Sequence, residues 1–428
     1  MSLEKLTREL GKAIQQDERY LAMQKAIEAN EKDTALNELM SKIQLIQVSY
    51  QHEASKEDKN QQKLEAYDKE FGEIYTQIMA NPNMQAYEAA RDAVKDFLNA
   101  EFREEIILPS GTTEAINLVA FSFGEAFVGE GDEVIVTEAE HHSNIVPWQM
   151  MCRRKGAVLK VLPVDDSGHL MVEKLDELLS ERTRIVAVTH ISNVLGIINP
   201  VKDIISKCHE RGVPVLVDGA QGAVHCKVDV QDLDCDFYVF SGHKLYAATG
   251  TGVLYGKKKW LDAMPPYMGG GEMVGTVSFK ETTYAPLPMK FEAGTRNFAS
   301  AATLKPALDL FNSLNNNELN KEMDKIRDYL LDFFLNDSRF RLYGVPRGTN
   351  EEKIPLFSFT VEGVHHEDLA LILDKMGIAV RSGQMCAEPL MDRFGVTGML
   401  RVSLAPYNTM EEAEYFVKCL NKAIEMLM

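Results

Sequence analysis

The sequence predicts an α/β protein whose main domain has a mostly parallel sheet, preceded by an all-α helical segment and followed by a smaller α/β domain. Between residues 105 and 240, short apolar runs alternate with amphipathic stretches, as in parallel strands joined by helices. Residues 1–88 contain only two glycines and read as helices. Beyond residue 300, helical and strand-like stretches mix. We therefore expect domains at residues 1–88, 89–300 and 301–428.

Composition and charge exclude several classes of protein. The chain has 428 residues, 45% of them hydrophobic, an ordinary balance for a globular protein with more than one core. Its formal net charge of -18 argues against nucleic acid or an anionic membrane as a partner. Six cysteines without a C-x-x-C pair argue against a zinc site or a disulfide scaffold. Because the beginning is charged and no long apolar run follows, we expect no signal peptide, no membrane span and a cytoplasmic location.

The first segment is expected to form two or three long amphipathic helices. Apolar residues recur at helical spacing in two sets, at positions 36, 39, 40, 43 and 46 and at positions 64, 67, 71, 74, 75 and 78. The polar stretch at residues 52–60 predicts a turn between them. Such helices bury little alone, so they should pack as a hairpin, dimerise or lie on the rest of the chain. A structural or oligomerising module is the simplest interpretation.

The second segment alternates strands and helices. We expect strands at residues 105–108, 134–136, 158–164, 185–188, 213–217 and 237–240, and helices at 89–98, from 110, near 144, at 172–179 and at 201–208. In the third segment, we expect helices at residues 301–314, 319–335, 367–376 and from 411, with strand-like runs at 356–361 and 378–380. Ligands of a parallel sheet bind at the carboxyl ends of its strands.

Polar residues follow the predicted strands at the points where each strand ends. They are Thr112, Thr113, Glu140, His141, Asn193, Asp218, Gln221, Ser241, His243 and Lys244. A lysine directly after a buried strand is unusual, because lysine is rarely buried without a partner. Desolvation lowers its pKa, and the neutral amine is a nucleophile that forms Schiff bases with carbonyl cofactors. On this stretch alone, a surface lysine at a strand end is an equally good interpretation.

Pyridoxal phosphate has four requirements, and each has a candidate. Its phosphate binds at helix N-termini with nearby hydroxyls, which Thr112 and Thr113 supply, and Ser241 and His243 add donors. Its pyridine nitrogen requires a buried carboxylate, here Asp218. His141 could stack on the ring, and Lys244 could bind the aldehyde. Singly, these residues have plainer interpretations, such as a helix cap, a turn residue and a buried polar histidine. Together, on successive strands, they favour the cofactor.

Residues from about 88 onward resemble the Suf-type cysteine desulfurases of the class V aminotransferase superfamily, which have pyridoxal-phosphate fold type I. The motifs that carry the resemblance lie at residues 111–117, 140–148, 190–196, 217–221, 234–237, 241–246 and 291–295. The resemblance implies a homodimer that converts L-cysteine to L-alanine and an enzyme persulfide for iron–sulfur cluster assembly. The partner implied is a sulfur-acceptor protein of the Suf system.

The resemblance also implies roles for single residues. Lys244 holds the cofactor, Asp218 pairs with its pyridine nitrogen, Gln221 contacts its phenolic oxygen, and His141 stacks on its ring. Its phosphate is bound by Thr112, Thr113, Ser241, His243 and, from the second subunit, Thr295. Asn193 contacts cofactor and substrate, Arg401 and Arg381 bind the substrate, and Cys386 accepts the sulfur. A Gly- and Pro-punctuated loop with Arg381 nearby suits an exposed, partly ionised thiolate at Cys386, whereas Cys152, Cys208 and Cys419 fall in predicted helices.

The first ninety residues resemble the small helical YlbF/YmcA-like regulatory family. The likeness rests on residues 6–10, 17–20, 75 and 81–87. We expect this module to stand where family members carry an N-terminal segment that lines the substrate side of the pocket. The join lies at about residues 87–91, and a natural fusion, a rearranged gene and an engineered chimera all remain open.

Several departures from the family pattern bear on activity. Gln384 and Met385 stand where two histidines commonly precede the cysteine, and Ala247 and Ala248 replace a Gly-Pro pair. Without the family's N-terminal segment we expect cofactor binding with slow desulfuration. The alternatives are a selenocysteine lyase or another pyridoxal-phosphate β-lyase, and a regulatory or scaffold protein whose pyridoxal-phosphate domain turns over poorly.

Overall fold

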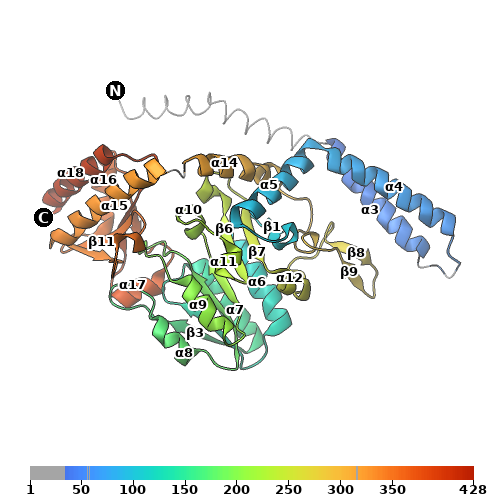
Figure 1. The fold of residues 1–428 in the computed structure, drawn as a ribbon, viewed down its shortest axis with the longest axis horizontal. Coiled ribbons are helices and arrows are strands. Elements are labelled where there is room, and N and C mark those ends of the chain that lie inside the picture. The colour runs from blue at the N-terminus through green and yellow to red at the C-terminus, as the bar shows by residue number, and fades with distance from the viewer. Residues whose placement is uncertain (1–33, 55, 57, 315–316) are drawn as a thin grey trace.

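The structure is a computed structural model that describes residues 34–54, 56, 58–314 and 317–428. A large sheet with helices on both faces occupies the middle of the molecule (Figure 1). A smaller sheet with its own helices lies at one side, and a hairpin of two helices projects from the other side. The predicted α/β class is confirmed. Within the described residues, no helix is both long and apolar enough to cross a membrane.

The large sheet has seven strands in the order β1-β7-β6-β5-β4-β2-β3. Their bounds are β1 Ile106–Ile107, β2 Glu133–Thr137, β3 Val158–Leu162, β4 Thr183–Thr189, β5 Val215–Asp218, β6 Phe237–Ser241 and β7 Gly252–Gly256. The five strands from β6 to β3 pair in parallel, and β7 pairs antiparallel with both β6 and β1. The mostly parallel sheet is therefore confirmed, and β7 is a strand that the sequence did not predict.

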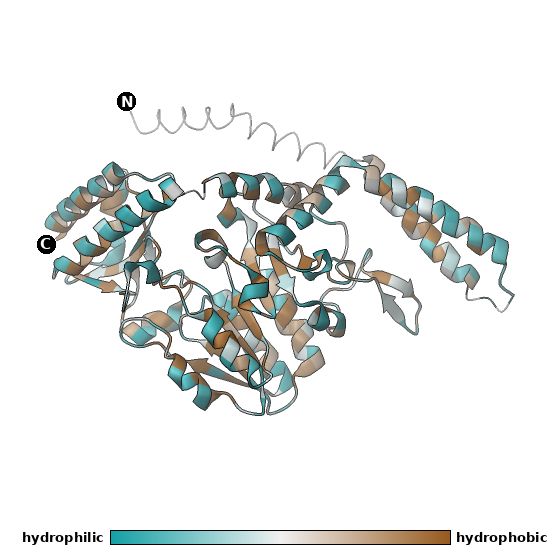
Figure 2. Cartoon of the chain, viewed as in Figure 1, coloured by the Kyte–Doolittle hydropathy of each residue, from teal (hydrophilic) through white to brown (hydrophobic). Residues whose placement is uncertain are grey.

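Two apolar clusters, one on each face, cover the large sheet. One includes residues of α5 (Pro82–Leu98), α9 (Val201–His209), α14 (Leu304–Leu314) and α17 (Glu388–Phe394). The other includes residues of α6 (Thr112–Phe127), α7 (Val146–Lys155) and α12 (Lys258–Ala263). The strands between them are drawn mainly in the brown of apolar residues (Figure 2). Continuous apolar strands are required because both faces are buried.

Short elements precede, connect or follow the strands of the large sheet. They are η1 Arg103–Glu105, η2 His142–Asn144, η3 Val172–Lys174, α8 Leu175–Leu178, α10 Gly222–His225, α11 Val230–Leu233, η4 Gly242–Leu245 and η5 Met289–Phe291. The helix expected at residues 172–179 is thus a 3₁₀ turn followed by one α-helical turn. A separate two-stranded hairpin, β8 (Val274–Val277) with β9 (Thr282–Tyr284), pairs antiparallel.

The small sheet has four antiparallel strands in the order β10-β11-β13-β12. Their bounds are β10 Phe340–Tyr343, β11 Leu356–Val361, β12 Arg381–Gly383 and β13 Met399–Ser403, and the helices beside them are α15 Asn317–Asn336, α16 His366–Lys375 and α18 Met410–Leu427, with η6 Asn350–Glu352 preceding β11. One apolar cluster joins this sheet to the three helices. The strand expected at residues 378–380 begins instead at Arg381, because residues 381–383 pair with β13.

The helix expected at residues 301–314 is two helices. They are α13 (Phe298–Ala302) and α14, and both contact α5. The expected domain boundary at residue 300 therefore falls within α13, which packs against α5 and α14, two helices that cover the large sheet. The boundary at residue 88 likewise falls inside the single helix α5. The three-domain division stays a prediction.

The helical hairpin consists of α3 (Thr34–Ala54) and α4 (Gln61–Ala80). Asn60 caps α4 by accepting a hydrogen bond from the backbone N–H of Lys63, and Asn81 caps α5, which begins at a proline. The buried apolar residues of the hairpin form one cluster with residues of α5 and with Phe298 and Ala301 of α13. The polar turn lies where the sequence predicts it. The motifs at residues 6–10 and 17–20 lie outside the described residues.

Candidate active site

Two groups of opposite charge lie at neighbouring strand ends of the large sheet. Asp218 is the last residue of β5, and Lys244 lies in η4, directly after the parallel strand β6. Burial raises the pKa of Asp218 and lowers the pKa of Lys244, while the Asp218 charge opposes the second shift. Lys244 therefore loses its proton more readily than a surface lysine, as a nucleophilic amine must.

Hydroxyl groups gather at the beginning of α6. The backbone N–H of Thr112 donates to Ser241 Oγ over 2.9 Å, and the two hydroxyl oxygens are 2.7 Å apart. The chain is tightly packed here, since a Cβ atom on Gly252 would lie 2.4 Å from the Cα atom of Gly111. A helix N-terminus with adjoining hydroxyls suits a phosphate group. Larger side chains at these glycines would disturb that arrangement.

His141 and Thr113 are linked through Ser143, which the sequence did not single out. The backbone N–H of Ser143 donates to His141 Nδ1 over 3.1 Å, and Ser143 Oγ lies 2.8 Å from Thr113 Oγ1. Burial, followed by the charge of Lys244, lowers the pKa of His141 to about 4. The imidazole is therefore neutral at pH 7, which favours stacking against an aromatic ring.

A buried carboxylate holds the loop that carries His141. Glu140 accepts hydrogen bonds from Thr137 Oγ1 and Asn144 Nδ2, each over 2.7 Å, and from the backbone N–H of Thr189 over 2.8 Å. Asn144 in turn accepts from Trp148 Nε1 over 3.0 Å. Burial raises the pKa of Glu140 to about 8, against the effect of its donors. In the sequence, the regular spacing of residues 140, 144 and 148 was the one feature that could have indicated these hydrogen bonds.

Asn193 joins the large sheet to the loop of Cys386. Its side-chain Nδ2 donates to the backbone oxygen of Met385 over 2.8 Å. Its own backbone oxygen accepts from a terminal nitrogen of Arg401 over 2.7 Å. Asn193 therefore contacts both the predicted substrate arginine and the residue next to the predicted sulfur acceptor.

Arg381 and Arg401 lie directly opposite each other on β12 and β13. Like charges at such cross-strand positions repel, and burial together with Arg381 lowers the pKa of Arg401 to about 10. Arg401 Nε is buried and makes no hydrogen bond within the described residues. A terminal nitrogen of Arg381 lies 3.8 Å from Cys386 Sγ. An anion placed between the two guanidinium groups would relieve their repulsion.

The backbone at Cys386 is unusual. Met385 and Cys386 have φ angles of 55° and 57°, a left-handed conformation that costs non-glycine residues energy and requires support from surrounding structure. The support includes a hydrogen bond from the backbone N–H of His142 to the Cys386 oxygen, over 2.8 Å. The Met385 side chain is buried in the large apolar cluster, so it packs in the core where the family commonly has a histidine.

A cavity of about 560 Å³ separates the large and small sheets beside Lys244. Gln221, Lys244 and Arg401 all line it. Among the described residues that line it, none belongs to α3 or α4. The other predicted site residues lie outside this lining. Four of them are exposed, namely Thr113, His243, Thr295 and Arg381.

The other cysteines differ from Cys386 in their surroundings. All six are unpaired thiols. Burial raises the pKa of Cys152 and of Cys226 to about 11 and that of Cys208 to about 12, which keeps these thiols protonated at pH 7. Cys386 is half-buried and has an arginine beside its sulfur, so its sulfur is better placed to react than those of the buried cysteines.

The donor set fits pyridoxal phosphate. A buried carboxylate at Asp218, a lysine of lowered pKa at Lys244, a neutral imidazole at His141, and paired hydroxyls at Thr112 and Ser241 each match one part of the cofactor. All five lie at the carboxyl end of the large sheet, where a strand ends or the next helix begins. Parallel sheets bind ligands at this carboxyl end of their strands.

Comparison with known families agrees with this arrangement. Residues 50–416 match the family described as aminotransferase class-V. The chain belongs to the class V aminotransferase family. Enzymes of this family that are cysteine desulfurases depend on pyridoxal phosphate, so the cofactor expected from the sequence is supported.

Cysteine desulfurases are among the relatives of the chain in both sequence and structure. The chain is 47% identical over 351 residues to one from Cronobacter sakazakii, covering 80% of this chain and 84% of the relative. A cysteine desulfurase structure from Escherichia coli superposes with a TM-score of 0.76 at 39% identity, covering 91% of this chain and 92% of the other. An apo structure from Thermococcus onnurineus also has a TM-score of 0.76, at 34% identity, with 81% and 85% covered.

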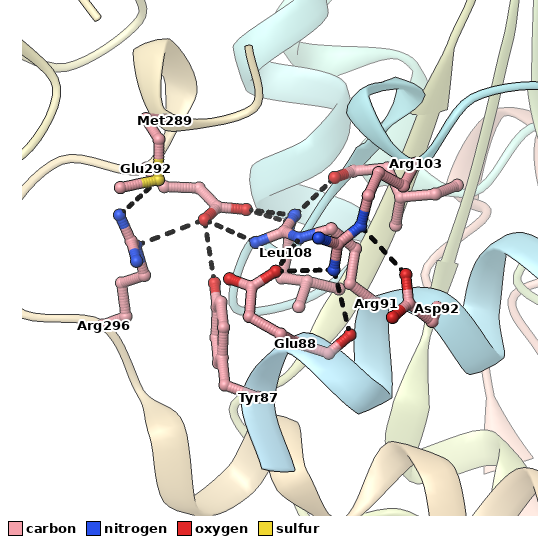
Figure 3. A network of polar contacts seen from close by, with 10 residues as sticks. Tyr87, Glu88, Arg91, Asp92, Arg103, Leu108, Met289, Glu292 and Arg296 are labelled. Carbon is pink, nitrogen blue, oxygen red and sulfur yellow. Dashed lines mark hydrogen bonds and ion pairs between the residues drawn. The ribbon is translucent and has the colours of Figure 1, made fainter. Parts of the chain in front are cut away.

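A polar network that the sequence did not reveal fastens α5 to the loop before Thr295 (Figure 3). Arg91 donates two hydrogen bonds to Glu292, over 2.8 and 2.9 Å, and a third to the backbone oxygen of Ile106 over 2.5 Å. Glu292 also accepts from Tyr87 Oη over 2.9 Å. Arg91 and Glu292 are 201 positions apart, so no local pattern indicates the pair.

Proposed function

We propose that this protein is a pyridoxal-phosphate-dependent cysteine desulfurase. The observation that carries the proposal is that Lys244 and Arg401 line the same cavity. Asn193 joins Arg401 to Met385, the residue before Cys386. Similarity to cysteine desulfurases over most of the chain supports the same activity.

The reaction transfers sulfur from L-cysteine to Cys386. When bound, pyridoxal phosphate supplies an electron sink for bonds broken at the amino acid. The Cys386 thiolate attacks the substrate sulfur, so a sulfur–sulfur bond forms as the carbon–sulfur bond breaks. The carbon skeleton keeps the electrons of the broken bond, takes up a proton and leaves as alanine. Lys244, with its lowered pKa, moves the proton at the substrate α-carbon.

Each remaining site residue has a binding or orienting role. Arg401 binds the substrate carboxylate as a fork of donors, and Arg381, whose terminal nitrogen lies 3.8 Å from Cys386 Sγ, also binds the substrate. Asp218 keeps a pyridine nitrogen protonated. His141 stacks on the ring.

The hydroxyl groups at the beginning of α6 bind the phosphate group of the cofactor. Thr112, Thr113 and Ser241 bind it together with His243. Thr295 reaches it from the second subunit of a homodimer. Gln221 contacts the phenolic oxygen.

The remaining assignments concern where the protein works. We infer a cytoplasmic enzyme of the Suf type that passes its persulfide sulfur to an acceptor protein for iron–sulfur cluster assembly. Residues 1–88 form a YlbF-like helical module, residues 89–300 bind the cofactor, and residues 301–428 form the small domain. The cavity beside Lys244 receives no wall from α3 or α4 within the described residues. Desulfuration is therefore slow compared with enzymes that close this side of the pocket, because loose positioning costs rate.

The test is release of alanine and sulfide from L-cysteine by the purified holoprotein, with dithiothreitol present. We expect equal amounts of both products, and loss of sulfide release in Cys386→Ser. A yellow protein that releases neither product would refute the activity and favour a regulatory or scaffold role. Faster release from L-selenocysteine than from L-cysteine would instead favour a selenocysteine lyase.

A further inference from the structure

The small domain donates hydrogen bonds to four consecutive backbone oxygens in one turn of the large domain. The turn follows β4 and comprises residues 193–196, called here the carbonyl turn. The donors, in order, are Arg401, Ser358 Oγ over 2.5 Å, Lys353 Nζ and the Ile354 backbone N–H over 2.9 Å.

The two side-chain donors in the middle of this set are fully enclosed. Lys353 is 1% exposed and Ser358 is 0% exposed. The oxygens that they bind belong to Val194 and Leu195, which are also buried. Within the described residues Lys353 makes no ion pair with a carboxylate, and its Nζ lies 5.3 Å from the centre of the Phe357 ring. Burial lowers the pKa of Lys353 to about 7. A buried lysine costs energy unless its contacts compensate, so this placement favours a specific role for the Leu195 contact.

The backbone of the carbonyl turn is closely packed against the small domain, which leaves no room for a side chain at two glycines. A Cβ atom on Gly344 would lie 2.3 Å from the Leu195 oxygen, and one on Gly196 would lie 2.8 Å from the Leu356 oxygen. The small domain thus approaches the turn from two sides. Loss of one donor would leave a buried carbonyl oxygen without its hydrogen bond, which is unfavourable.

Asn193, the first residue of the carbonyl turn, connects these hydrogen bonds to the predicted substrate arginine and the loop of Cys386. Asn193 holds Arg401 through its backbone oxygen and Met385 through its side chain. Met385 and Cys386 both have left-handed backbones and need such support. A shift of the carbonyl turn therefore moves the anchor of the cysteine loop and one partner of the substrate arginine together.

We propose that Lys353 and Ser358 are positioning residues that hold the carbonyl turn so that Asn193 sets the place of the Cys386 loop. This inference rests on the proposed function. Neither side chain is assigned a contact with substrate. Lys353 lines the cavity beside Lys244, whereas Ser358 does not, so Ser358 is the variant that tests the path through Val194 to Asn193.

The experiment measures Cys386 alkylation by iodoacetamide, which needs no turnover. We compare the holoprotein with Lys353→Met and Ser358→Ala and follow the modified cysteine by peptide mapping. Since the loop loses support, we expect Cys386 to be alkylated several-fold faster in both variants, with cofactor absorbance unchanged. The kcat for alanine release should fall by roughly tenfold, because small misplacements of reacting groups have effects of this size or larger.

A matched control separates positioning from general loss of stability. Lys160 also donates to a backbone oxygen, that of Leu178 over 2.9 Å, but at the far edge of the large sheet. Lys160→Met should leave the alkylation rate of Cys386 unchanged. Lys353→Arg keeps a cationic donor and should recover part of the lost kcat. Unchanged alkylation in both Lys353→Met and Ser358→Ala would overturn the inference, whereas failure of the unmodified protein to form alanine would overturn only the proposed function.

Discussion

Replacing Arg91 with methionine tests how α5 is attached to the rest of the protein. Arg91 is 0% exposed and pairs with Glu292, which is 6% exposed. The pair is bidentate, with nitrogen–oxygen distances of 2.8 and 2.9 Å. Against the effect of burial, the charge of Glu292 raises the pKa of Arg91, and the charge of Arg91 lowers the pKa of Glu292. Methionine keeps the apolar length of the side chain but removes the charge and four hydrogen bonds, two to Glu292, one to the Ile106 oxygen and one to Glu88.

The size of the effect follows from what remains around Glu292. Removing one partner of a buried ion pair costs about 3–5 kcal/mol, because the other charge is left without compensation. Glu292 would keep hydrogen bonds from Tyr87 and the backbone of Leu108, and Arg296 Nε lies 3.3 Å away. These contacts offset part of the loss. We therefore expect Arg91→Met to lower the free energy of unfolding by about 3 kcal/mol.

Urea unfolding of the holoprotein, followed by fluorescence, measures this loss. Arg103→Met is the control, because Arg103 also forms two ion pairs, with Glu88 and Asp92, but its side chain is 39% exposed. Exposed pairs contribute at most about 1 kcal/mol. An equal loss in both variants would refute the argument from burial. The double variant Arg91→Met, Glu292→Leu should lose less than the sum of its single changes.

Four further results are expected. Lys244→Ala should lose the cofactor attachment that borohydride makes permanent, as measured by absorbance of the reduced protein. Cys386→Ser should keep cofactor absorbance and lose persulfide formation, whereas Cys152→Ser should keep both. Burial lowers the pKa of His190 and His225 to about 4, so the unfolded chain binds protons more readily below pH 6.5. The contribution of these two histidines to stability should be complete above pH 6.5 and fall by up to about 3 kcal/mol per pH unit between pH 6.5 and 4, as measured by the difference in urea unfolding between the protein and His190→Gln, His225→Gln. A family N-terminal segment grafted ahead of residue 91 should raise the rate of alanine release without changing cofactor occupancy.

Each of these results has a contrary outcome. Borohydride-stable attachment in Lys244→Ala would place the cofactor on another amine. A persulfide mapped to Cys226 or Cys235 would remove Cys386 from the reaction. A difference in stability that stays level from pH 6.5 to 4 would mean that both histidines are protonated in the fold. A rate as high as that of intact desulfurases in the unmodified chain would mean that the helical module closes the pocket.

The sequence alone predicted the class of the fold and its mostly parallel sheet. Both follow from local pattern, since an apolar strand between helices is recognisable wherever its partners lie. The site residues at strand ends could be named for the same reason, because topology brings such ends to one edge. Their individual roles, including those of Thr295 and His243, stay predictions.

Only the tertiary structure identified the Arg91–Glu292 pair and the donors of the carbonyl turn. Lys353 and the Leu195 oxygen that it binds are 158 positions apart, and the acceptor is a backbone atom that every residue type carries. No residue pattern can therefore mark the contact. Burial is likewise a property of the folded chain, and it is burial that lowers the pKa of Lys244 and makes the Arg91 pair strong.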